Sequence, residues 1–351
     1  LRFGEFNNEW HRYKIKDTLK IKSGRDQKSI IDENGNNPIL GTGGIIGKTN
    51  SFLYDKPSVL IGRKGTINKP QYMDTPFWTV DTLFYSEIHK EFLPKFIYYV
   101  FQNINWKKYD ESTGVPSLTA STIENIKYYI PNLKEQQKIA NFFTLIDKKI
   151  NLQTQKVELL KMYEKKFIKN LLNSNNKDWK NVTLKDCCLG FDHLRKPIIS
   201  TQRKTGNIPY YGANGIQDYI NDFLFDGEYI LLAEDGGHFD EFFCKPIAQY
   251  INGKAWVNNH AHVIQGNNEN CTKFLYYCLK HKDIRQYVNG TSRAKLNQDN
   301  MWKIRLKLPP LNKQIQISNT LSIFDKKILI QEKLKKRLED LKKCLLQQMF
   351  I

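Results

Sequence analysis

The chain has 351 residues, of which 40% are hydrophobic and 26% charged, a balance that excludes a disordered protein and leaves room for two domains of ordinary size. Lys and Arg number 54 against 36 Asp and Glu, and the net charge of +18 favours a polyanionic partner, either nucleic acid or an anionic membrane surface. No run of about eighteen apolar residues occurs, so no segment is expected to cross a membrane. The six cysteines stand at irregular spacings that fit neither a disulfide framework nor a zinc motif, which indicates a cytoplasmic protein.

Residues 1–130 alternate short apolar runs with turns rich in Gly, Asn and Pro, a pattern that predicts strands and loops. Ser58–Ile61 is one such run, and the segment Phe96–Phe101 predicts a short helix. Residues 41–49 look at first like a phosphate-binding P-loop. The spacing fails because that motif requires glycine at the position of Thr42, so no nucleotide site is expected.

A long helix is predicted over residues 131–172. It begins behind Pro131, where Asn132 and Glu135 have the spacing of a capping box. At about 1.5 Å per residue, a helix of about forty residues extends about 60 Å. Apolar residues recur along it in the alternating steps of four and three that are typical of a coiled coil, at Ile139, Phe143, Ile146 and Ile150.

After a polar linker at residues 173–177, the chain repeats this order. Pro209–Ile216 matches Pro38–Ile45 at an offset of 171 residues, and Lys273–Tyr277 matches Lys95–Tyr99 at an offset of 178. The growth of the offset from 171 to 178 means that the second copy carries seven extra residues. We interpret the chain as a tandem repeat whose four parts are 1–130, 131–172, 173–308 and 309–351.

The second long helix, predicted over residues 309–351, repeats the apolar seam of the first. Its seam residues are Ile317, Leu321, Phe324 and Ile328, and leucines at 334, 338, 341 and 345 continue the pattern. Because both helices are long and share this spacing, we expect the two seams to pack against each other. The alternative is an ordinary amphipathic helix that is buried on its own domain.

Side chains that could carry catalysis do not gather into a sequence motif. His260 and His262 flank Ala261 in a strand-like segment, but no third metal ligand stands nearby, so packing or a DNA contact is the expected role. The acidic pair Glu234–Asp235 has no carboxylate counterpart in the first copy. We therefore expect no metal, no cofactor and no enzymatic activity in this chain.

The paired motifs resemble those of the specificity subunits of type I restriction-modification enzymes. The resemblance covers nearly the whole chain, with minor departures at Asn132, in place of a second proline, and at Ile315, where the first copy has Gln137. It is carried by Pro-x-Leu-x-x-Gln-x-x-Ile at the start of each long helix, by an Asp-Lys-Lys-Ile turn in each, and by a Trp-x-x-x-x-Leu/Ile-x-Asp opening in each copy: Pro131 and Pro309, Asp147 and Asp325, Trp10 and Trp179.

The resemblance implies an α+β fold with two tandem target-recognition domains, separated by two long helices that form an antiparallel coiled coil with pseudo-two-fold symmetry. Each domain would read one half of a bipartite, asymmetric site in double-stranded DNA. Two modification (methyltransferase) subunits would dock on the helices, and restriction subunits would join them to give an ATP-driven nuclease. The methyl donor and ATP would bind those partners, and the seam residues would serve as spacer and docking site.

The aligned loops 62–66 and 233–237 invert their charge, since Arg63 and Lys64 correspond to Glu234 and Asp235. A base-reading loop would change in this way, because Arg favours guanine and an acid favours the amino group of cytosine. Neutral drift on a solvated turn is the alternative.

Two further aligned loops, 109–118 and 287–296, carry hydroxyl groups and cations that commonly contact phosphates. The predicted DNA contacts of the whole chain are Arg63, Lys64, Thr66, Lys69, Ser112, Thr113, Ser117, Glu234, Asp235, His238, Arg293 and Lys295.

Two rival functions remain open. The chain would be the DNA-reading part of a fused restriction-methyltransferase if methyltransferase motifs stood upstream in a longer reading frame. It would be a protein-binding helical scaffold if it bound no duplex in the presence of a saturating methyltransferase.

Overall fold

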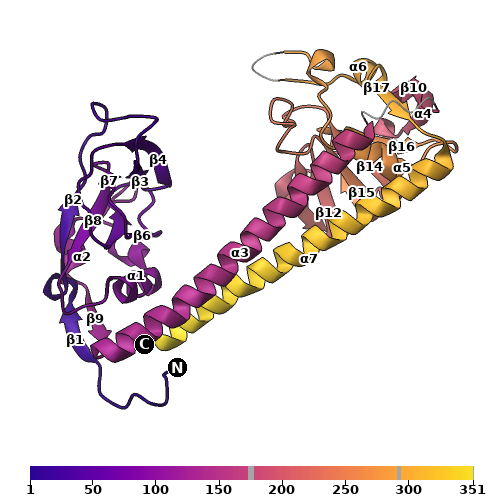
Figure 1. The fold of residues 1–351 in the computed structure, drawn as a ribbon. Coiled ribbons are helices and arrows are strands. Elements are labelled where there is room, and N and C mark those ends of the chain that lie inside the picture. The colour runs from indigo at the N-terminus through magenta and orange to yellow at the C-terminus, as the bar shows by residue number, and fades with distance from the viewer. Residues whose placement is uncertain (173–177, 291–293, 351) are drawn as a thin grey trace. The chain divides into compact units, whose positions relative to one another are not determined.

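The structure, a computed structural model, describes residues 1–172, 178–290 and 294–350. The chain forms two compact units: unit 1 is Leu1–Gln155 with Glu332–Ile351, and unit 2 is Lys156–Gln331. Helix α3 (Leu133–Leu172) begins in unit 1 and ends in unit 2, whereas α7 (Leu311–Met349) begins in unit 2 and ends in unit 1 (Figure 1). The compact units therefore include parts of both long helices instead of ending at the predicted boundaries 130 and 308.

Unit 1 contains three small sheets and three short connecting helices besides its helix parts. The first sheet is antiparallel, in the order β2 (Leu19–Ser23), β8 (Leu83–Ile88), β5 (Ser58–Gly62) and β6 (Gln71–Met73). The second has the order β4 (Gly44–Thr49), β3 (Asn37–Gly41) and β7 (Trp78–Thr79), and the third pairs β1 (His11–Lys14) with β9 (Lys127–Ile130). The helices are α1 (Pro94–Asn103), α2 (Ala120–Asn125) and the single turns η1 (Ile15–Asp17) and η2 (Trp106–Tyr109).

Unit 2 contains a larger sheet of six strands. Its order is β11 (Cys188–Gly190), β16 (Ala261–Gly266), β14 (Phe225–Ala233), β15 (Ala248–Val257), β12 (Thr205–Gly212) and β13 (Gly215–Ile220). A separate pair joins β10 (Lys180–Thr183) to β17 (Arg305–Leu308). The helices are α4 (Leu184–Cys187), α5 (Thr272–Leu279), α6 (Gln298–Trp302), η3 (Asp192–Leu194), η4 (Ser200–Gln202) and η5 (Arg285–Tyr287).

The strand β5 is buried along its whole length, which explains the continuous apolar run that predicted it. Successive side chains of a strand point to opposite faces of its sheet. Val59 and Ile61 accordingly face the cluster that contains α1, and Leu60 faces a second cluster. In the equivalent strand β14, Leu232 lies in the cluster that contains α5, and Leu231 lies in another.

The two copies share a strand arrangement that is unusual within these sheets. The hairpin β3–β4 pairs in parallel with β7, with Leu40 opposite Thr79. The hairpin β12–β13 pairs in parallel with β15, with Tyr211 opposite Val257. These pairings join the same offsets of 171 and 178 that relate the two copies in sequence, so the predicted repeat is also present in the fold.

A buried glutamine explains the motif at the start of each long helix. The side chain of Gln136 accepts a hydrogen bond from the N–H of Leu93, just before α1, at 3.0 Å and donates one to the carbonyl of Pro131 at 3.0 Å. Gln314 makes the same two hydrogen bonds with the equivalent residues of the second copy, at 2.9 Å each. The glutamine therefore ties the start of the domain's short helix to the start of the long helix.

The aspartate of the Asp-Lys-Lys-Ile turn has an equally defined role. In unit 1 the hydroxyl of Tyr99 donates to Asp147 at 2.8 Å, and in unit 2 that of Tyr277 donates to Asp325 at 2.5 Å. Within unit 1, Lys342 of α7 lies 2.5 Å from the same Asp147 carboxylate. Each aspartate thus fixes the long helix on the short helix of its own unit.

The expected capping box of α3 is only half formed. The side chain of Asn132 accepts a hydrogen bond from the N–H of Glu135 at 3.0 Å. The Glu135 carboxylate, however, is fully buried and forms a bidentate pair with Arg2, at 2.7 Å for each contact. A cation from the first residues of the chain therefore takes the place of the backbone N–H that a full box would use.

The expectation that the two seams face each other is wrong. In unit 1, Ile139 and Phe143 pack in the domain core together with Leu346 from the last part of α7. In unit 2, Ile317 and Leu321 pack with residues from the last part of α3, and Phe324 contacts Phe167 of that helix, with ring centroids 5.9 Å apart: Ile168 and Leu171 complete the contact. Because the helices pair in antiparallel fashion, each seam meets the end of the other helix, and both readings of the amphipathic pattern apply at once.

We expect Gln136→Ala to lower the free energy of unfolding of the structure that contains unit 1 by about 1–3 kcal/mol, because it leaves a buried N–H and a buried carbonyl without partners. Urea denaturation followed by fluorescence measures this loss. Gln137→Ala is the matched control, since this neighbouring side chain is exposed and bonds only Asn141. Equal losses in the two variants would contradict the role of the buried amide.

Candidate nucleic-acid interface

Two loops that carry predicted DNA contacts lie side by side in unit 1. The carbonyl of Arg63 accepts a hydrogen bond from the N–H of Leu118 at 2.9 Å, and a β-bridge joins Lys64 to Ser117. The loops are more than forty residues apart in sequence, and neither loop's pattern predicts the other as its neighbour. Because the contacts are between backbone groups, the two loops form one surface whatever side chains they carry.

Arg63 is the best placed of the predicted base readers in unit 1. Arg63, Lys64 and Lys69 are exposed, whereas Thr66 is half-buried. The guanidinium carbon of Arg63 lies 5.9 Å from the centre of the Phe84 ring. An arginine held at an aromatic face keeps the N–H donors along its edge, so Arg63 presents a planar donor fork at the surface.

Asp110 organises the second loop of this surface. Its carboxylate accepts hydrogen bonds from the N–H of Ser117 at 2.9 Å and from the N–H and hydroxyl of Ser112 at 3.1 and 2.8 Å. These hydrogen bonds, with that of Ser117 foremost, lower the pKa of Asp110. Ser112 therefore directs its hydroxyl to a carboxylate of its own loop, while Thr113 is exposed beside it.

Unit 2 brings the corresponding loops together in the same way. The carbonyl of Glu234 accepts a hydrogen bond from the N–H of Leu296 at 2.7 Å, and a β-bridge joins Asp235 to Lys295. The Lys295 side chain is 48% exposed, and its amine lies 3.1 Å from the Glu234 carboxylate. Arg293, the other cation predicted for this loop, lies outside the described residues.

The Glu234 carboxylate is held inside unit 2 instead of projecting outward. Its side chain is 14% exposed and lies 2.6 Å from the Arg195 guanidinium and 3.7 Å from the His262 ring. Burial would raise the pKa of Glu234, but hydrogen bonds from Arg195 and Lys295 outweigh it and lower the pKa. The charge inversion relative to Arg63 is therefore balanced within the domain, a reason that the aligned sequences do not reveal.

The two units place chemically different pairs at one position of the shared frame. His262 stands 178 residues after Phe84, at the offset that relates the second parts of the two copies. Unit 1 thus has an arginine over a phenylalanine ring, and unit 2 has a glutamate beside an imidazole. Such a difference at one position is what two readers of different bases require.

His262 is not isolated, contrary to the expectation from sequence. Its Nδ1 lies 2.6 Å from the Asp192 carboxylate and its Nε2 lies 2.7 Å from the carbonyl oxygen of Leu296. Both partners are acceptors, so both ring nitrogens donate and the ring carries a positive charge. Because Leu296 follows Lys295 directly, this buried histidine also fixes the loop that carries that lysine.

Asp192, Glu234 and His262 bring potential metal-ligand atoms within 4.8 Å of one another. Sequence spacing hides this group because Asp192 stands 70 residues before His262. The two carboxylates are already paired with Arg195, at 3.3 and 2.6 Å, and the latter also with Lys295. The charges therefore balance as an ion-pair network, which explains the arrangement without an added cation.

A turn that sequence reasoning missed borders the same surface in unit 2. The turn 213–217 joins β12 to β13 and encloses, with Asp235 and His260, a cleft of about 460 Å³. His260 Nδ1 lies 2.5 Å from the Asp235 carboxylate, and the Asn214 amide donates to the carbonyl of Gly236 at 2.7 Å. The glycine-flanked turn between two matching strands is the signal that would have identified it. The remaining predicted contact, His238, lies 3.5 Å from Glu241.

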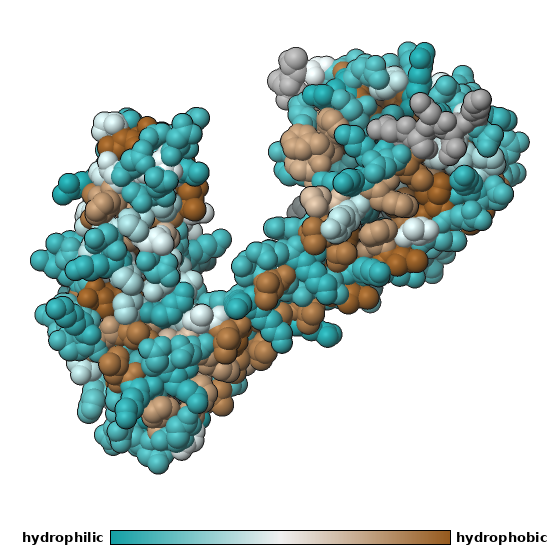
Figure 2. Space-filling model, in the orientation of Figure 1, coloured by the Kyte–Doolittle hydropathy of each residue, from teal (hydrophilic) through white to brown (hydrophobic). Residues whose placement is uncertain are grey.

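The surface of both long helices carries apolar side chains besides the buried seams, and Figure 2 shows hydrophobic patches along them. Their spacing includes repeated steps of seven residues, which places them on one face of a supercoiled helix. On α3 these residues are Leu145, Leu152 and Leu159, and on α7 they are Ile323, Ile330 and Leu341, each at least 45% exposed. None of the helices in the described residues is long and apolar enough to span a bilayer.

A basic chain that builds the same two-loop surface twice defines a two-domain nucleic-acid reader. The family model of the type I restriction modification DNA specificity domain matches residues 7–162 and again residues 176–340. The chain therefore belongs to this family and carries two of its domains, which makes it a sequence-specific DNA-recognition subunit.

Similar proteins agree with this assignment. A protein described as a type I restriction enzyme specificity subunit of Haemophilus influenzae is 38% identical over 151 residues, which cover 43% of this chain and 38% of that protein. A type I specificity subunit of Mycoplasma pneumoniae is 30% identical over 238 residues, 63% of this chain and 83% of that protein. The solved S subunit from M. genitalium has the same fold, with a TM-score of 0.69 over 99% of this chain and 98% of that one, at 17% identity.

We expect the ion-pair network to make unit 2 sensitive to acid. Burial would raise the pKa of Asp192, but hydrogen bonds from His262 and Val263 outweigh it and lower the pKa. A carboxylate with a lowered folded-state pKa stabilises the protein above its ordinary pKa, and this contribution is lost as the pH falls through the folded-state value. The melting temperature of Asp192→Asn should thus be lower than that of the native protein at pH 7, and the difference should shrink below about pH 4.

Differential scanning calorimetry between neutral and acid pH measures this difference. The exposed carboxylate variant Asp226→Asn serves as the control and should show little change at either pH. A difference for Asp192→Asn that is the same at every pH would indicate lost packing rather than a lost charge.

Proposed function

We propose that this chain is the non-catalytic reading subunit of a type I restriction-modification complex, and that each of its two domains reads one half of a bipartite, asymmetric DNA site. The observation that carries the proposal is the pair of adjoining loops that is built twice on one frame with different side chains. Identical frames place two readers in equivalent settings, and different side chains let them read different bases.

In the first domain the reader is Arg63. Its exposed guanidinium has the planar geometry that accepts the two acceptor atoms of guanine in the major groove. Lys64, Lys69 and Thr113 lie exposed in the same loops or directly beside them, where they would hold phosphates and set the register. These roles divide the predicted residues into one that specifies sequence and several that position the protein.

In the second domain the internal pairing of Glu234 changes the assignment of roles. The amine of Lys295 is half exposed and is steered by Glu234, so it is the better candidate for a direct contact with DNA. Asn214, at the edge of the neighbouring cleft, is a second candidate because its amide lies on the turn that faces the recognition loop. Glu234 then acts by positioning Lys295 rather than by touching a base.

Modification subunits would dock through the exposed apolar faces of α3 and α7. A helix whose buried seam is satisfied within the chain has no internal use for a second apolar face, and such faces commonly pack on partner helices. The methyl donor and ATP would bind those subunits, together with a restriction subunit where one is present. The seam residues predicted as docking sites would instead hold the two helices together.

Replacing residues 1–130 with the equivalent domain of a relative tests this proposal. The methylated motif, read by sequencing of methylated DNA from cells that also contain the modification subunits, should change in one half only, because the second domain is untouched. The reciprocal replacement of residues 178–308 should change the other half. A change of both halves by either replacement would contradict independent reading.

Arg63→Ala should weaken binding at a single base position of the first half-site by about 1–3 kcal/mol and relax the preference there. Arg63→Lys is the matched variant, because lysine keeps the charge but not the two-pronged geometry. Binding to duplexes substituted one position at a time, at several salt concentrations, measures both. A uniform loss on all duplexes that lysine restores would make Arg63 a phosphate contact.

A further inference from the structure

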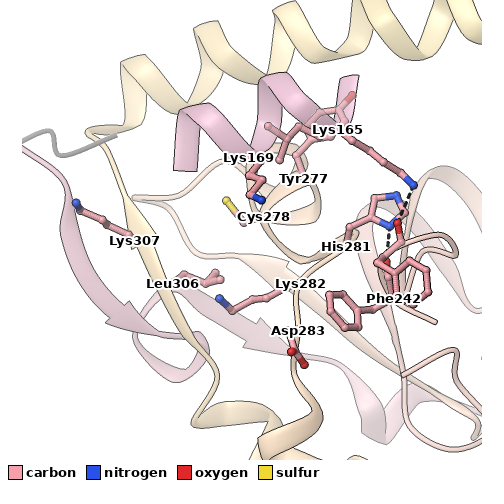
Figure 3. A pocket seen from close by; sticks show the side chains of 12 residues that line it. Lys165, Lys169, Phe242, Tyr277, Cys278, His281, Lys282, Asp283, Leu306 and Lys307 are labelled. Atoms are coloured by element: carbon pink, nitrogen blue, oxygen red, sulfur yellow. Dashed lines mark hydrogen bonds between the residues drawn. The ribbon is translucent and has the colours of Figure 1, made fainter. Parts of the chain in front are cut away.

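The largest cleft among the described residues of unit 2 is separate from the recognition loops. It has a volume of about 620 Å³ and shares no lining residue with the cleft beside Asp235. It lies between the last part of α3, the end of α5 and the strand β17, as Figure 3 shows. Its apolar floor is made by Ile168, Cys278 and Leu306, of which the last two are buried.

Unit 1 contains the equivalent cleft, and there it holds an aromatic side chain of the chain itself. Val100, Asn103 and Tyr128 line that cleft, and they stand 178 residues before Cys278, His281 and Leu306. Its volume is only about 250 Å³, because Phe350 from the end of α7 lines it as well.

Phe350 is well held at this position. Its ring packs on Phe96, Phe143 and Trp10 with centroid distances of 5.5, 6.1 and 6.2 Å, and its carbonyl accepts a hydrogen bond from the Asn103 amide at 3.0 Å. The corresponding position of the second copy is Leu172, which has a smaller side chain than phenylalanine. The repeat therefore shows what this kind of cleft accepts, namely an aromatic ring followed by a polar backbone group.

The cleft of unit 2 is strongly basic, unlike that of unit 1. Its rim carries four lysines: Lys165, Lys169, Lys282 and Lys307. Asp283 is the one acid among the described lining residues, and Arg285 neutralises it at 2.7 Å. An occupant that complements this rim carries negative charge.

One wall of the cleft comes from Phe242 and Phe243, in the longer second copy. The Lys165 amine donates to the carbonyl of Phe243 at 2.8 Å, and His281 Nδ1 donates to the carbonyl of Phe242 at 2.7 Å (Figure 3). These bonds hold the wall on α3 and α5, while the Phe243 side chain is 64% exposed. An exposed phenylalanine beside an apolar floor favours a partner that brings an apolar group of its own.

We propose that this cleft binds an acidic segment of a modification subunit, which inserts an aromatic side chain onto the floor and places its carboxylates among the four lysines. A nucleic acid fits less well, since its backbone would leave the apolar floor and Phe243 uncovered. The proposal rests on the proposed function only for the identity of the partner. It adds a docking site that is distinct from the exposed faces of the long helices.

Photocrosslinking in the assembled complex tests the site directly. The photoreactive residue p-benzoylphenylalanine replaces Phe243 in the full chain, which is co-produced with its modification subunit and irradiated, and the product is mapped by mass spectrometry. The expected product joins position 243 to a segment of that subunit that contains an aromatic residue and several acidic residues. A complex that methylates DNA but gives no such product would overturn the docking site and leave the proposed function standing, whereas a native complex that methylates no motif would refute the proposed function itself.

Charge reversal provides the second measurement. The double variant Lys165→Glu/Lys282→Glu should weaken the association of the modification subunit at least tenfold, whereas Lys165→Arg/Lys282→Arg should restore it. Lys185→Glu, an exposed lysine of unit 2 outside the cleft, should leave it unchanged. If the double variant binds the subunit normally but loses affinity for DNA, the cleft is a phosphate site and the proposal is wrong. Melting temperatures of all variants establish that they are folded.

Discussion

The buried amide of one glutamine in each copy is the interaction on which the arrangement of this protein depends. A helix that begins inside a protein must find partners for the backbone groups around its start. Gln136 and Gln314 supply them for two helices at once, since each bonds the residue before the short helix and the proline before the long one. The tyrosine–aspartate bond one short-helix length further on fixes the same two helices a second time. Each recognition domain is thereby locked to the beginning of its long helix.

On this fixed frame, the two domains diverge in their electrostatics rather than in their backbone. One carries an arginine over an aromatic ring, and the other carries a network of two carboxylates with arginine, lysine and histidine. The network is internally neutralised, so the net basic character that attracts DNA comes from exposed lysines and arginines elsewhere. Attraction and discrimination are therefore carried by different side chains, as the physics of duplex recognition requires.

The sequence predicted what depends on local pattern and on self-comparison: both long helices, the short helix of each copy, the buried strands and the repeat itself. It did not predict what depends on distant partners. A seam spaced by four and three shows which face of a helix is buried but not what covers it, so Ile139 and Ile317 were paired wrongly. Likewise the inverted charge at Glu234 was visible, whereas its partner Arg195, 39 residues away, was not. The wall at Phe242 and Phe243 lies in the longer copy, where self-comparison has less to compare.

The pairing of the recognition loops through backbone groups has an evolutionary consequence. The hydrogen bonds that join loop 62–66 to loop 109–118, and their counterparts around Glu234 and Leu296, run between N–H and carbonyl groups that every residue other than proline possesses. Substitutions on the outer face of these loops therefore do not remove the bonds that shape them. Mutation can change the side chains exposed to DNA while the scaffold keeps its fold, so new specificities are accessible by single steps. An exception marks the limit of this freedom: a side chain at Gly62 would bring its Cβ within 2.3 Å of the carbonyl oxygen of Thr66, so that glycine must be retained for the variation around it to be tolerated.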